Sequence, residues 1–459
     1  MNGWPQVRQG ALAPHAARRR GDPALTLRLT VEKMAYGAKG IARHEGKVYF
    51  IADAVVGDII EGQVTQDHGR YADVAIDKLI EASPLRGPAA CRYAGDCGGC
   101  QWMGIAYEEQ LSWKQNFVVS ALSRIGKLPD GFTVEMIGSP AAHGYRNRVL
   151  IRLHHHVDGT MNVGYFRRQS RDLVPITACA IAAPAINQLI ANLRNLTLEQ
   201  PEAFTVRMEI QEIPATERGS LLVTVYPGDG NRETISRFTA LVAELPGVHW
   251  AGLVFDLRNA PNVHFESDLD RNFATKPGQF QQVNLELNRT LRRLVLDYVE
   301  KVRPSRILDV FCGSGNLSLP LADGTRYVEG VEANRDAIAV AKHNASVNQL
   351  SNVVYLTGDA EKHLWKVSRG GEQFDMVILD PPRQGFPKGV VPLKNLDPQS
   401  MIYVSCDPTT LARDLAYLCR ADHYMVKRVV ALDFFPNTYH VETVVFLEKN
   451  ENIPVTSDQ

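Results

Sequence analysis

The chain has 459 residues, of which 45% are hydrophobic and 22% are charged. This length is typical of about three domains, and the hydrophobic content is sufficient for packed cores, which excludes a disordered chain. The formal net charge of −1 excludes a protein that attracts nucleic acid as a uniform polycation, and no stretch reaches the roughly 18 uncharged apolar residues of a membrane-spanning helix.

Residues 1–24 contain three consecutive arginines, at positions 18 to 20, but no apolar run follows them. A secretory signal needs such a run, so this segment is not a signal peptide. We expect a disordered extension.

Residues 25–85 are predicted to form a small β-barrel. Apolar and polar residues alternate from Leu25 to Val31, a second apolar run follows at 48–51, and several glycines punctuate short strands. This spacing predicts a small antiparallel, OB-like barrel, and it resembles the TRAM domain, which is an RNA-binding module.

Three cysteines, Cys91, Cys97 and Cys100, stand in a C-x5-C-x2-C arrangement, and Cys179 is a distant fourth. Glycines 98 and 99 allow a tight turn that brings two sulfurs to one centre. Four thiolates suit either zinc or a [4Fe-4S] cluster, and the spacing does not separate the two. Disulfides are disfavoured, since nothing indicates secretion.

A basic stretch follows at residues 145–171, where six arginines face one acidic residue, Asp158. Arginine matches phosphate geometry, and the aromatic residues Tyr145, Tyr165 and Phe166 are able to stack on unpaired bases. The stretch therefore predicts contact with RNA. The alternative is an ordinary solvated face of a sheet.

A glycine-rich turn lies between an apolar strand and a helix at residues 307–317. Glycines let the backbone approach a ligand closely, and ligands of parallel sheets bind at the carboxyl ends of the strands. The turn lacks the full dinucleotide fingerprint. Its D-x-F-C-G-x-G-N form resembles the S-adenosylmethionine loop of Rossmann-like methyltransferases.

Several acidic residues follow predicted strands in the same part of the chain. Strands at 327–331, 353–357 and 376–379 alternate with helices such as 336–348, which predicts a parallel, doubly wound sheet. The acidic residues at or just after strand ends are Asp309, Glu332, Asp359 and Asp380. Each one alone is equally well explained as a helix cap, but together they predict a shared site.

Cys406 follows the apolar strand 401–405 and precedes a predicted helix. The dipole and free N–H groups of a helix N-terminus favour a thiolate, whereas the neighbouring carboxylate of Asp407 opposes it. Cys406 is therefore a candidate nucleophile, with a small buried hydrophobic residue as the alternative.

Motifs along most of the chain resemble those of the RNA uracil-C5 methyltransferases, and in particular the type that modifies uracil 1939 of 23S rRNA. The matching segments are 280–284 (FQQVN), 405–408 (SCDP) and 435–442 (FPNTYHVE). The resemblance implies methyl transfer from S-adenosylmethionine to 23S rRNA, an enzyme of class EC 2.1.1. One local departure is Asp407, where asparagine is frequent in the family.

The resemblance also implies roles for individual residues. Cys406 is implied as nucleophile and Glu442 as general base. The resemblance also favours a [4Fe-4S] cluster, with Cys91, Cys97, Cys100 and Cys179 as its ligands. Contacts with the cofactor or the target base are implied for Gln282, Phe311, Asn316, Glu332, Asp359 and Asp380, among which Gln282 and Asp380 are alternatively uracil ligands.

The chemistry explains the need for a thiol and a carboxylate. Uracil C5 is a poor nucleophile, so a thiolate that adds to C6 creates an enolate with negative charge on C5. After methylation C5 carries an extra proton, which a base must remove before the thiolate leaves. Arg383 either stabilises the enolate oxygen or pairs with a neighbouring acid.

We therefore predict an α/β protein with an OB-like barrel at 25–85, an α+β iron-sulfur and RNA-contacting domain at 86–270, and a Rossmann-like methyltransferase domain at 271–459. We expect it in the cytoplasm, and nothing in the sequence indicates an obligate protein partner or a membrane. Two alternatives stay open: a sibling enzyme that acts on tRNA or another 23S rRNA site, and a noncatalytic RNA-binding protein.

Overall fold

The computed structural model describes residues 26–129, 131–198, 202–217 and 219–450. The predicted extension at 1–24 lies outside them. Two compact units divide the chain: residues 26–35 with 39–84, and residues 36–38 with 85–450. They are described separately below.

The smaller unit is a curled sheet in the order β1-β5-β6-β4-β3-β2. Its strands are β1 (Thr26–Thr30), β2 (Lys33–Ala35), β3 (Lys39–His44), β4 (Lys47–Ala52), β5 (Ile59–Asp67) and β6 (Tyr71–Glu81). Alternate residues of β1, such as Leu27 and Leu29, are buried in its core, as the sequence pattern predicted. The prediction of a wholly antiparallel barrel was wrong, because β4 pairs with β6 in parallel. The β5–β6 hairpin turns the chain back so that β6 runs in the direction of β4.

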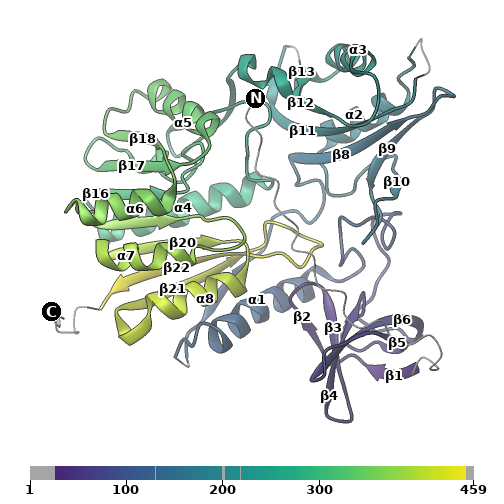
Figure 1. The fold of residues 1–459 in the computed structure, drawn as a ribbon, viewed down its shortest axis with the longest axis horizontal. Coiled ribbons are helices and arrows are strands. Elements are labelled where there is room, and N and C mark those ends of the chain that lie inside the picture. The colour runs from purple at the N-terminus through teal and green to yellow at the C-terminus, as the bar shows by residue number, and fades with distance from the viewer. Residues whose placement is uncertain (1–25, 130, 199–201, 218, 451–459) are drawn as a thin grey trace. The chain divides into compact units, whose positions relative to one another are not determined.

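The larger unit contains a central sheet in the order β10-β9-β8-β11-β12-β13 (Figure 1). These strands are β8 (Arg148–His155), β9 (Met161–Phe166), β10 (Leu173–Pro175), β11 (Phe204–Thr216), β12 (Gly219–Pro227) and β13 (Val248–Leu253). Helices α2 (Pro184–Arg194) and α3 (Arg232–Ala243) share one apolar core with the sheet. A hairpin of β14 (Val263–Asp268) and β15 (Arg271–Thr275) follows.

The same unit contains an eight-stranded sheet in the order β18-β17-β16-β19-β20-β22-β21-β7. Its strands are β7 (Val134–Ile137), β16 (Arg306–Val310), β17 (Tyr327–Glu332), β18 (Val353–Thr357), β19 (Met376–Leu379), β20 (Ser400–Ser405), β21 (Tyr424–Leu432) and β22 (Glu442–Lys449). The first five in this order are parallel, as predicted, and β22 is antiparallel to β20. Ligands of such a sheet are expected where the parallel strands end.

Helices cover both faces of this sheet (Figure 1). One core includes residues of α1 (Tyr107–Arg124), α6 (Ala360–Arg369), α7 (Val390–Leu396) and α8 (Pro408–Leu418), and the other includes α4 (Leu285–Val302) and α5 (Arg335–Val347). Both α1 and β7 precede the central sheet in sequence, yet they belong to this C-terminal layer. Within the described ranges, every helix is too short or too polar to cross a lipid bilayer.

Candidate active site and cysteine cavity

The sequence-predicted site residues gather where the parallel strands of the large sheet end. Asp380 follows β19, Cys406 follows β20, and Glu442 begins β22. In the antiparallel pairing of β20 and β22 the last pair is Ser405 with Thr443, so Cys406 and Glu442 occupy the next opposing positions. We call Asp309, Asp380, Cys406 and Glu442 the carboxyl edge.

The Cys406 thiol is half-buried in an acidic environment. Burial raises its pKa to about 12, and the carboxylates of Glu442, Asp380 and Asp407 act in the same direction. The charge of Arg383 opposes them and lowers the pKa. The resting thiol is therefore protonated at neutral pH, and its ionisation depends on the cation beside it.

The structure supports the opposing role that the sequence predicted for Asp407, and the effect of the α8 dipole on the thiol stays a prediction. Asp407, not Cys406, is the N-cap residue of α8, and its Oδ1 accepts hydrogen bonds from the N–H groups of Thr409 (2.9 Å) and Thr410 (3.1 Å). These are the free N–H groups on which the prediction relied, and a neighbouring carboxylate already uses them.

Glu442 lies on an interior strand, between β20 and β21, and is buried. This position rules out the alternative that Glu442 is merely a charged residue on the solvent face of an edge strand. Burial raises the pKa of Glu442 well above its usual range, the charge of Asp380 raises it further, and Arg383 lowers it. Burial and the nearby Asp309 likewise raise the pKa of Asp380. The edge thus holds carboxyl groups that are poised to exchange protons.

Arg383 is exposed, and its charge lowers the pKa of Cys406, Glu442 and His440. It is thus the cation that faces both the candidate nucleophile and the candidate base. The partly buried His440 has its pKa lowered to about 4, first by burial and then by Arg383, so its imidazole is neutral at physiological pH.

The glycine-rich turn after β16 has backbone conformations that few residues adopt. Gly315 has a φ of 86°, and a Cβ atom there would lie 2.5 Å from the Tyr355 hydroxyl. Phe311 has a φ of 68°, which is costly for a bulky residue, and its N–H donates to the Val331 carbonyl oxygen at 2.9 Å. Such strain is typical of a loop that is shaped to receive a ligand.

Asp309 carries the clearest sign of a ligand near this turn. It is buried, and within the described ranges no Lys or Arg side chain pairs with it; a hydrogen bond with the Ser318 side chain lowers its pKa, but this only partly offsets the effect of burial. Burial raises its pKa to about 7, and Glu332 at the end of β17 contributes in the same direction. An unpaired buried carboxylate needs a donor or a cation, and the amino group of S-adenosylmethionine is one that fits this chemistry.

In two other predicted cofactor residues, Asp359 and Glu332, one carboxylate oxygen already accepts a hydrogen bond from a backbone N–H group. One oxygen of Asp359 accepts from the Lys362 N–H at 2.9 Å and caps α6. Oε1 of Glu332 accepts from the Asn334 N–H at 2.8 Å. Their assignment as cofactor ligands stays a prediction.

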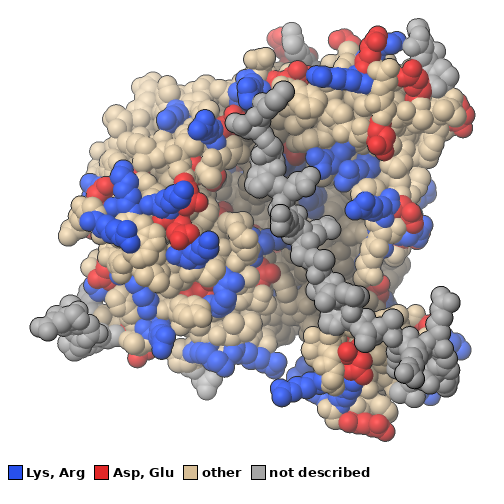
Figure 2. Space-filling view, viewed as in Figure 1, with Lys and Arg blue, Asp and Glu red and all other residues tan. Residues whose placement is uncertain are grey.

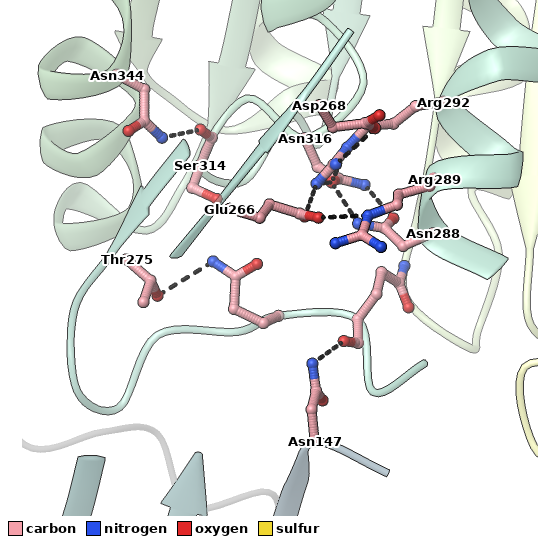
Figure 3. Close-up of polar contacts among 12 residues, drawn as sticks. Asn147, Glu266, Asp268, Thr275, Asn288, Arg289, Arg292, Ser314, Asn316 and Asn344 are labelled. Atoms are coloured by element: carbon pink, nitrogen blue, oxygen red, sulfur yellow. Dashed lines mark hydrogen bonds and ion pairs between the residues drawn. The ribbon is translucent and has the colours of Figure 1, made fainter. Parts of the chain in front are cut away.

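The side chain of Asn316 is held by hydrogen bonds within the protein (Figure 3), and so is the main chain of Gln282. The Asn316 Oδ1 accepts from Asn288 Nδ2 at 3.0 Å and from both Nε (3.0 Å) and Nη2 (2.8 Å) of Arg292. The main-chain oxygen of Gln282, which is buried, accepts from Asn147 Nδ2 at 3.3 Å. Direct contact of either side chain with a ligand remains a prediction.

All four predicted metal-ligating cysteines line one cavity of about 330 Å³. They are Cys91, Cys97, Cys100 and Cys179, and none forms a disulfide. The same cavity is lined by Arg383, Phe435, Thr438 and His440, which belong to the segments that carry the carboxyl edge. The thiols thus converge from two distant segments of sequence onto the neighbourhood of the active site.

In the part of the chain that the structure describes, no three histidine, cysteine or acidic side chains are close enough to hold a metal ion. The choice between zinc and a [4Fe-4S] cluster, which the spacing left open, stays a prediction.

Much of the basic stretch supports the cysteine loop. Arg167 pairs with Asp96, and Gly98 N–H donates to the Phe166 carbonyl oxygen at 3.0 Å. The prediction that Tyr145 and Tyr165 stack on RNA is not supported, because neither side chain is exposed. Tyr165 lines the cysteine cavity instead, and the Tyr145 hydroxyl donates to the Pro436 carbonyl oxygen at 3.2 Å.

Sequence reasoning missed the buried contacts that hold the base-bearing segment. Lys114 of α1 pairs with Asp433 at 2.5 Å, and both side chains are completely buried. Gln110, also on α1, accepts from the Asn437 N–H at 2.8 Å. The one available signal was a lysine and a glutamine four residues apart on the apolar side of a predicted helix.

Known proteins resemble this chain over most of its length. The tRNA (Uracil-5-)-methyltransferase family matches residues 267–450. A 23S rRNA (uracil(1939)-C(5))-methyltransferase RlmD of Pseudomonas fluorescens is 33% identical over 92% of this chain and 94% of its own length. An uncharacterized RNA methyltransferase of Aquifex aeolicus is 32% identical over 92% of this chain and 98% of its own length.

A solved structure agrees. The Pyrococcus abyssi tRNA (uracil-54, C5)-methyltransferase in complex with S-adenosyl-L-homocysteine has a TM-score of 0.65 and 25% sequence identity, and the match covers 92% of this chain and all of that one. These similarities confirm the resemblance drawn from the FQQVN, SCDP and FPNTYHVE motifs. The chain belongs to the RNA uracil-C5 methyltransferase family.

Proposed function

We propose that this protein methylates C5 of a uridine in 23S rRNA, using S-adenosylmethionine, in the cytoplasm. The observation that carries the proposal is the cross-strand position of Cys406 and Glu442, with Arg383 acting on both. A thiol, a buried carboxylate and a cation at one sheet edge are the groups that addition to a pyrimidine and removal of a proton require.

In the proposed reaction the Cys406 thiol loses its proton to water, and Sγ forms a bond to uracil C6. The electron pair of the C5–C6 double bond moves into an enolate, so that C5 becomes nucleophilic, and Arg383 offsets the negative charge. S-adenosylmethionine, when bound, supplies an electrophilic methyl group that C5 takes up. The Glu442 carboxylate then accepts the C5 proton, the C5–C6 double bond forms again, and the Cys406 thiolate leaves.

For the cofactor, the proposal relies on Asp309 and the strained turn. The buried carboxylate of Asp309, which has no cation beside it among the described residues, is suited to an ammonium group, and Glu332 at the end of the next strand is proposed to accept from ribose hydroxyls. Phe311, Asn316, Asp359 and Asp380 complete the proposed set around the cofactor and the target base, and Gln282 is proposed to hold the uracil.

For the cysteines we propose a [4Fe-4S] cluster as a structural group. Four unpaired thiols line one cavity, and no electron enters or leaves the methyl transfer. The cluster would hold residues 91–100 against the loops that carry Arg168, after β9, and Cys179, after β10. Burial raises the pKa of Cys100 to about 12, so ligation has to displace its proton.

For RNA, we propose the sheet face that carries Arg152 and Arg207 as a contact surface. These two arginines are cross-strand neighbours on β8 and β11, an unfavourable pairing that a phosphate would relieve. Arg152 lies 4.6 Å over the Phe166 ring and Arg207 lies 4.4 Å over the Tyr226 ring. Figure 2 shows Lys and Arg side chains gathered where Figure 1 labels β8 and β11. The curled sheet of residues 26–81 is proposed as a second, TRAM-like contact.

A sibling target in tRNA is the second candidate, since the family that matches residues 267–450 is described by a tRNA activity. Transfer of label from S-adenosylmethionine to unmodified 23S rRNA and to tRNA decides between them. We expect label in 5-methyluridine of 23S rRNA, at the position equivalent to 1939, and none after Cys406→Ala. Cys419→Ala, which removes a thiol at the end of α8, should retain activity. Label in tRNA alone would identify tRNA, and not 23S rRNA, as the substrate. Label that survives Cys406→Ala would overturn the covalent mechanism.

The cluster proposal has its own test. Anaerobically purified protein should contain iron and sulfide, with absorbance in the visible range, and Cys97→Ser should lose both. We expect Cys97→Ser also to lower the unfolding temperature and the affinity for RNA. A Cys97→Ser variant with unchanged folding and RNA affinity would contradict a structural role.

A further inference from the structure

A cluster of buried charged residues beside the glycine-rich turn has no role in the proposed chemistry. Its centre is Arg292 on α4, whose side chain is 1% exposed. We call Arg292, Glu266, Asp268, Asn288 and Asn316 the arginine cluster (Figure 3).

Every polar atom of the Arg292 guanidinium has a partner. Nη2 contacts Glu266 Oε1 at 2.7 Å, and Nη1 contacts Asp268 Oδ2 at 3.0 Å. Nε and Nη2 also donate to Asn316 Oδ1, at 3.0 and 2.8 Å, and the guanidinium lies 4.0 Å from the centre of the Phe273 ring. Arg292 therefore connects the β14–β15 hairpin to the residue that follows Gly315.

The amide of Asn316 is fixed by these contacts. Its Oδ1 accepts from Arg292 and from Asn288 Nδ2, and its Nδ2 donates to Asn288 Oδ1 at 2.9 Å. With the oxygen and the amide nitrogen both engaged inside the protein, the side chain is oriented by α4. Asn316 thus anchors the turn, and Arg292 and Asn288 fix the orientation from which it would contact the cofactor.

The turn needs such an anchor. Gly313 and Gly315 both have positive φ angles, 55° and 86°, and glycine leaves the backbone free to adopt many conformations. A loop that is ordered only when the ligand arrives loses affinity, because binding must then include the entropy cost of ordering it. A second contact restrains the same turn, since Asn344 Nδ2 donates to the Ser314 carbonyl oxygen at 3.3 Å.

We propose that Arg292 is a positioning residue for cofactor binding, which acts through Asn316 to hold the glycine-rich turn in its binding conformation. This inference rests on the proposed use of S-adenosylmethionine. Burying an ion-pair network is not by itself stabilising, because removing the charges from water offsets much of their attraction. Preorganisation of the turn is the function that the geometry supports.

The test uses Arg292→Lys, which retains the charge but lacks the planar fork that reaches two carboxylates and an amide at once. The dissociation constant for S-adenosylhomocysteine is measured by calorimetry on the full chain, and KM for S-adenosylmethionine and kcat are measured with saturating RNA. We expect the dissociation constant and KM to rise about tenfold, the effect of one or two lost charge-assisted hydrogen bonds, and kcat to stay within about twofold.

Arg289→Lys is the matched control. Arg289 lies on the same helix and pairs with the same Glu266, at 3.2 Å, but its side chain is 40% exposed. Among the described residues, its ion pairs are with Glu266 and Glu286 only. We expect cofactor affinity to be unchanged in Arg289→Lys. Equal losses in the two variants would point to general destabilisation and overturn the proposal.

Asn316→Ala and the double variant Arg292→Lys/Asn316→Ala complete the cycle. If Arg292 acts through Asn316, the double variant should bind S-adenosylhomocysteine no more weakly than Asn316→Ala alone. Additive losses, or wild-type affinity in Arg292→Lys, would overturn the inference while leaving the proposed function intact. A wild-type protein that binds no S-adenosylhomocysteine would overturn both.

Discussion

The carboxyl edge and the arginine cluster both contain buried charged residues. Among the described residues, however, the acids are paired with a cation in the arginine cluster and are not paired in this way at the carboxyl edge. In the arginine cluster Glu266 and Asp268 each contact a guanidinium at 3.0 Å or less. At the carboxyl edge, Asp309 pairs with no cation among the described residues, and burial raises the pKa of Asp309, Asp380 and Glu442.

This difference distinguishes acidic groups that are available to bind a ligand from acidic groups that stabilise the fold. A buried acid with a cation beside it is satisfied within the fold, so it gains nothing from a substrate. A buried acid without one stays under-satisfied until a ligand or a proton arrives, and such groups concentrate at functional sites. Lys114 and Asp433 belong to the first kind, because they pair with each other completely out of contact with solvent.

The largest expected effect is that of Glu442→Gln at the carboxyl edge. The variant should still form the bond between Cys406 and C6 and accept the methyl group, but it has no base for the C5 proton. We expect multiple-turnover rates to fall by about 10³-fold. A protein–RNA adduct that survives denaturing electrophoresis should accumulate. Normal turnover, or an adduct that fails to accumulate while methylation is lost, would remove Glu442 from the proposed role.

Next in size is the effect of Lys114→Met on the satisfied pair. Removing the lysine leaves Asp433 buried without its cation, which should cost about 3–5 kcal/mol of unfolding free energy. Denaturant unfolding followed by circular dichroism measures the loss. Lys114→Met/Asp433→Asn removes both charges and should recover a large part of it. A double variant as unstable as the single one would show that the charges are not what matters there.

Asp309→Asn tests the unpaired kind of acid. A pKa raised from 3.8 to about 7 means that the folded state holds a proton that the unfolded state has lost, so this group makes the protein less stable as pH rises from about 4 to 7. The rise is equivalent to roughly 4 kcal/mol at most.

We therefore expect Asp309→Asn to be more stable than wild type above pH 7 and to bind S-adenosylhomocysteine more weakly. Thermal unfolding between pH 4 and 8, with and without S-adenosylhomocysteine, measures both effects. Asp359→Asn, whose oxygen caps α6, is the control without a comparable gain. A loss of stability at pH 8 in Asp309→Asn would show that its carboxylate is already satisfied in the free protein.

The smallest effect is expected for Asp407→Asn. Asparagine retains the Oδ1 that caps α8 but removes a charge that raises the pKa of Cys406. A lower thiol pKa should increase the rate a few-fold near pH 7 and shift the rising limb of the pH–rate profile towards lower pH. Asp407→Ala, which loses the cap as well, separates the two contributions. Superimposable profiles for Asp407→Asn and wild type would contradict the prediction.

Much of the site could be predicted because local rules fix it. The strand at 401–405, the turn after Asp309 and the parallel alternation that follows place Cys406 and the acidic residues at one edge of a sheet. Glu442 could be assigned only through the family motif, since a charged residue at the start of an apolar strand is usually exposed. The pairing of β20 with β22 buries it.

Other parts could not be predicted because they depend on contacts between distant segments. Strand β7 belongs to the C-terminal layer, although more than 160 residues separate it from β16, the first of the parallel strands in sequence. The N–H groups at the start of α8 that were expected to favour the thiolate are capped by Asp407. Tyr145 and Tyr165 look like stacking residues in sequence, but Tyr165 lines the cysteine cavity and the Tyr145 hydroxyl donates to the Pro436 carbonyl oxygen.

The sequence by itself determined the order of the elements, the motifs that identify the family, and the residue types that carry the chemistry, because periodicity and turn residues act over a few positions. The tertiary structure alone decided which charges are satisfied. An acid such as Asp268 pairs with the guanidinium of Arg292, whereas Asp309 pairs with no cation among the described residues, and the packing of helices and strands decides which of these occurs. Burial then increases the difference in free energy between the two outcomes.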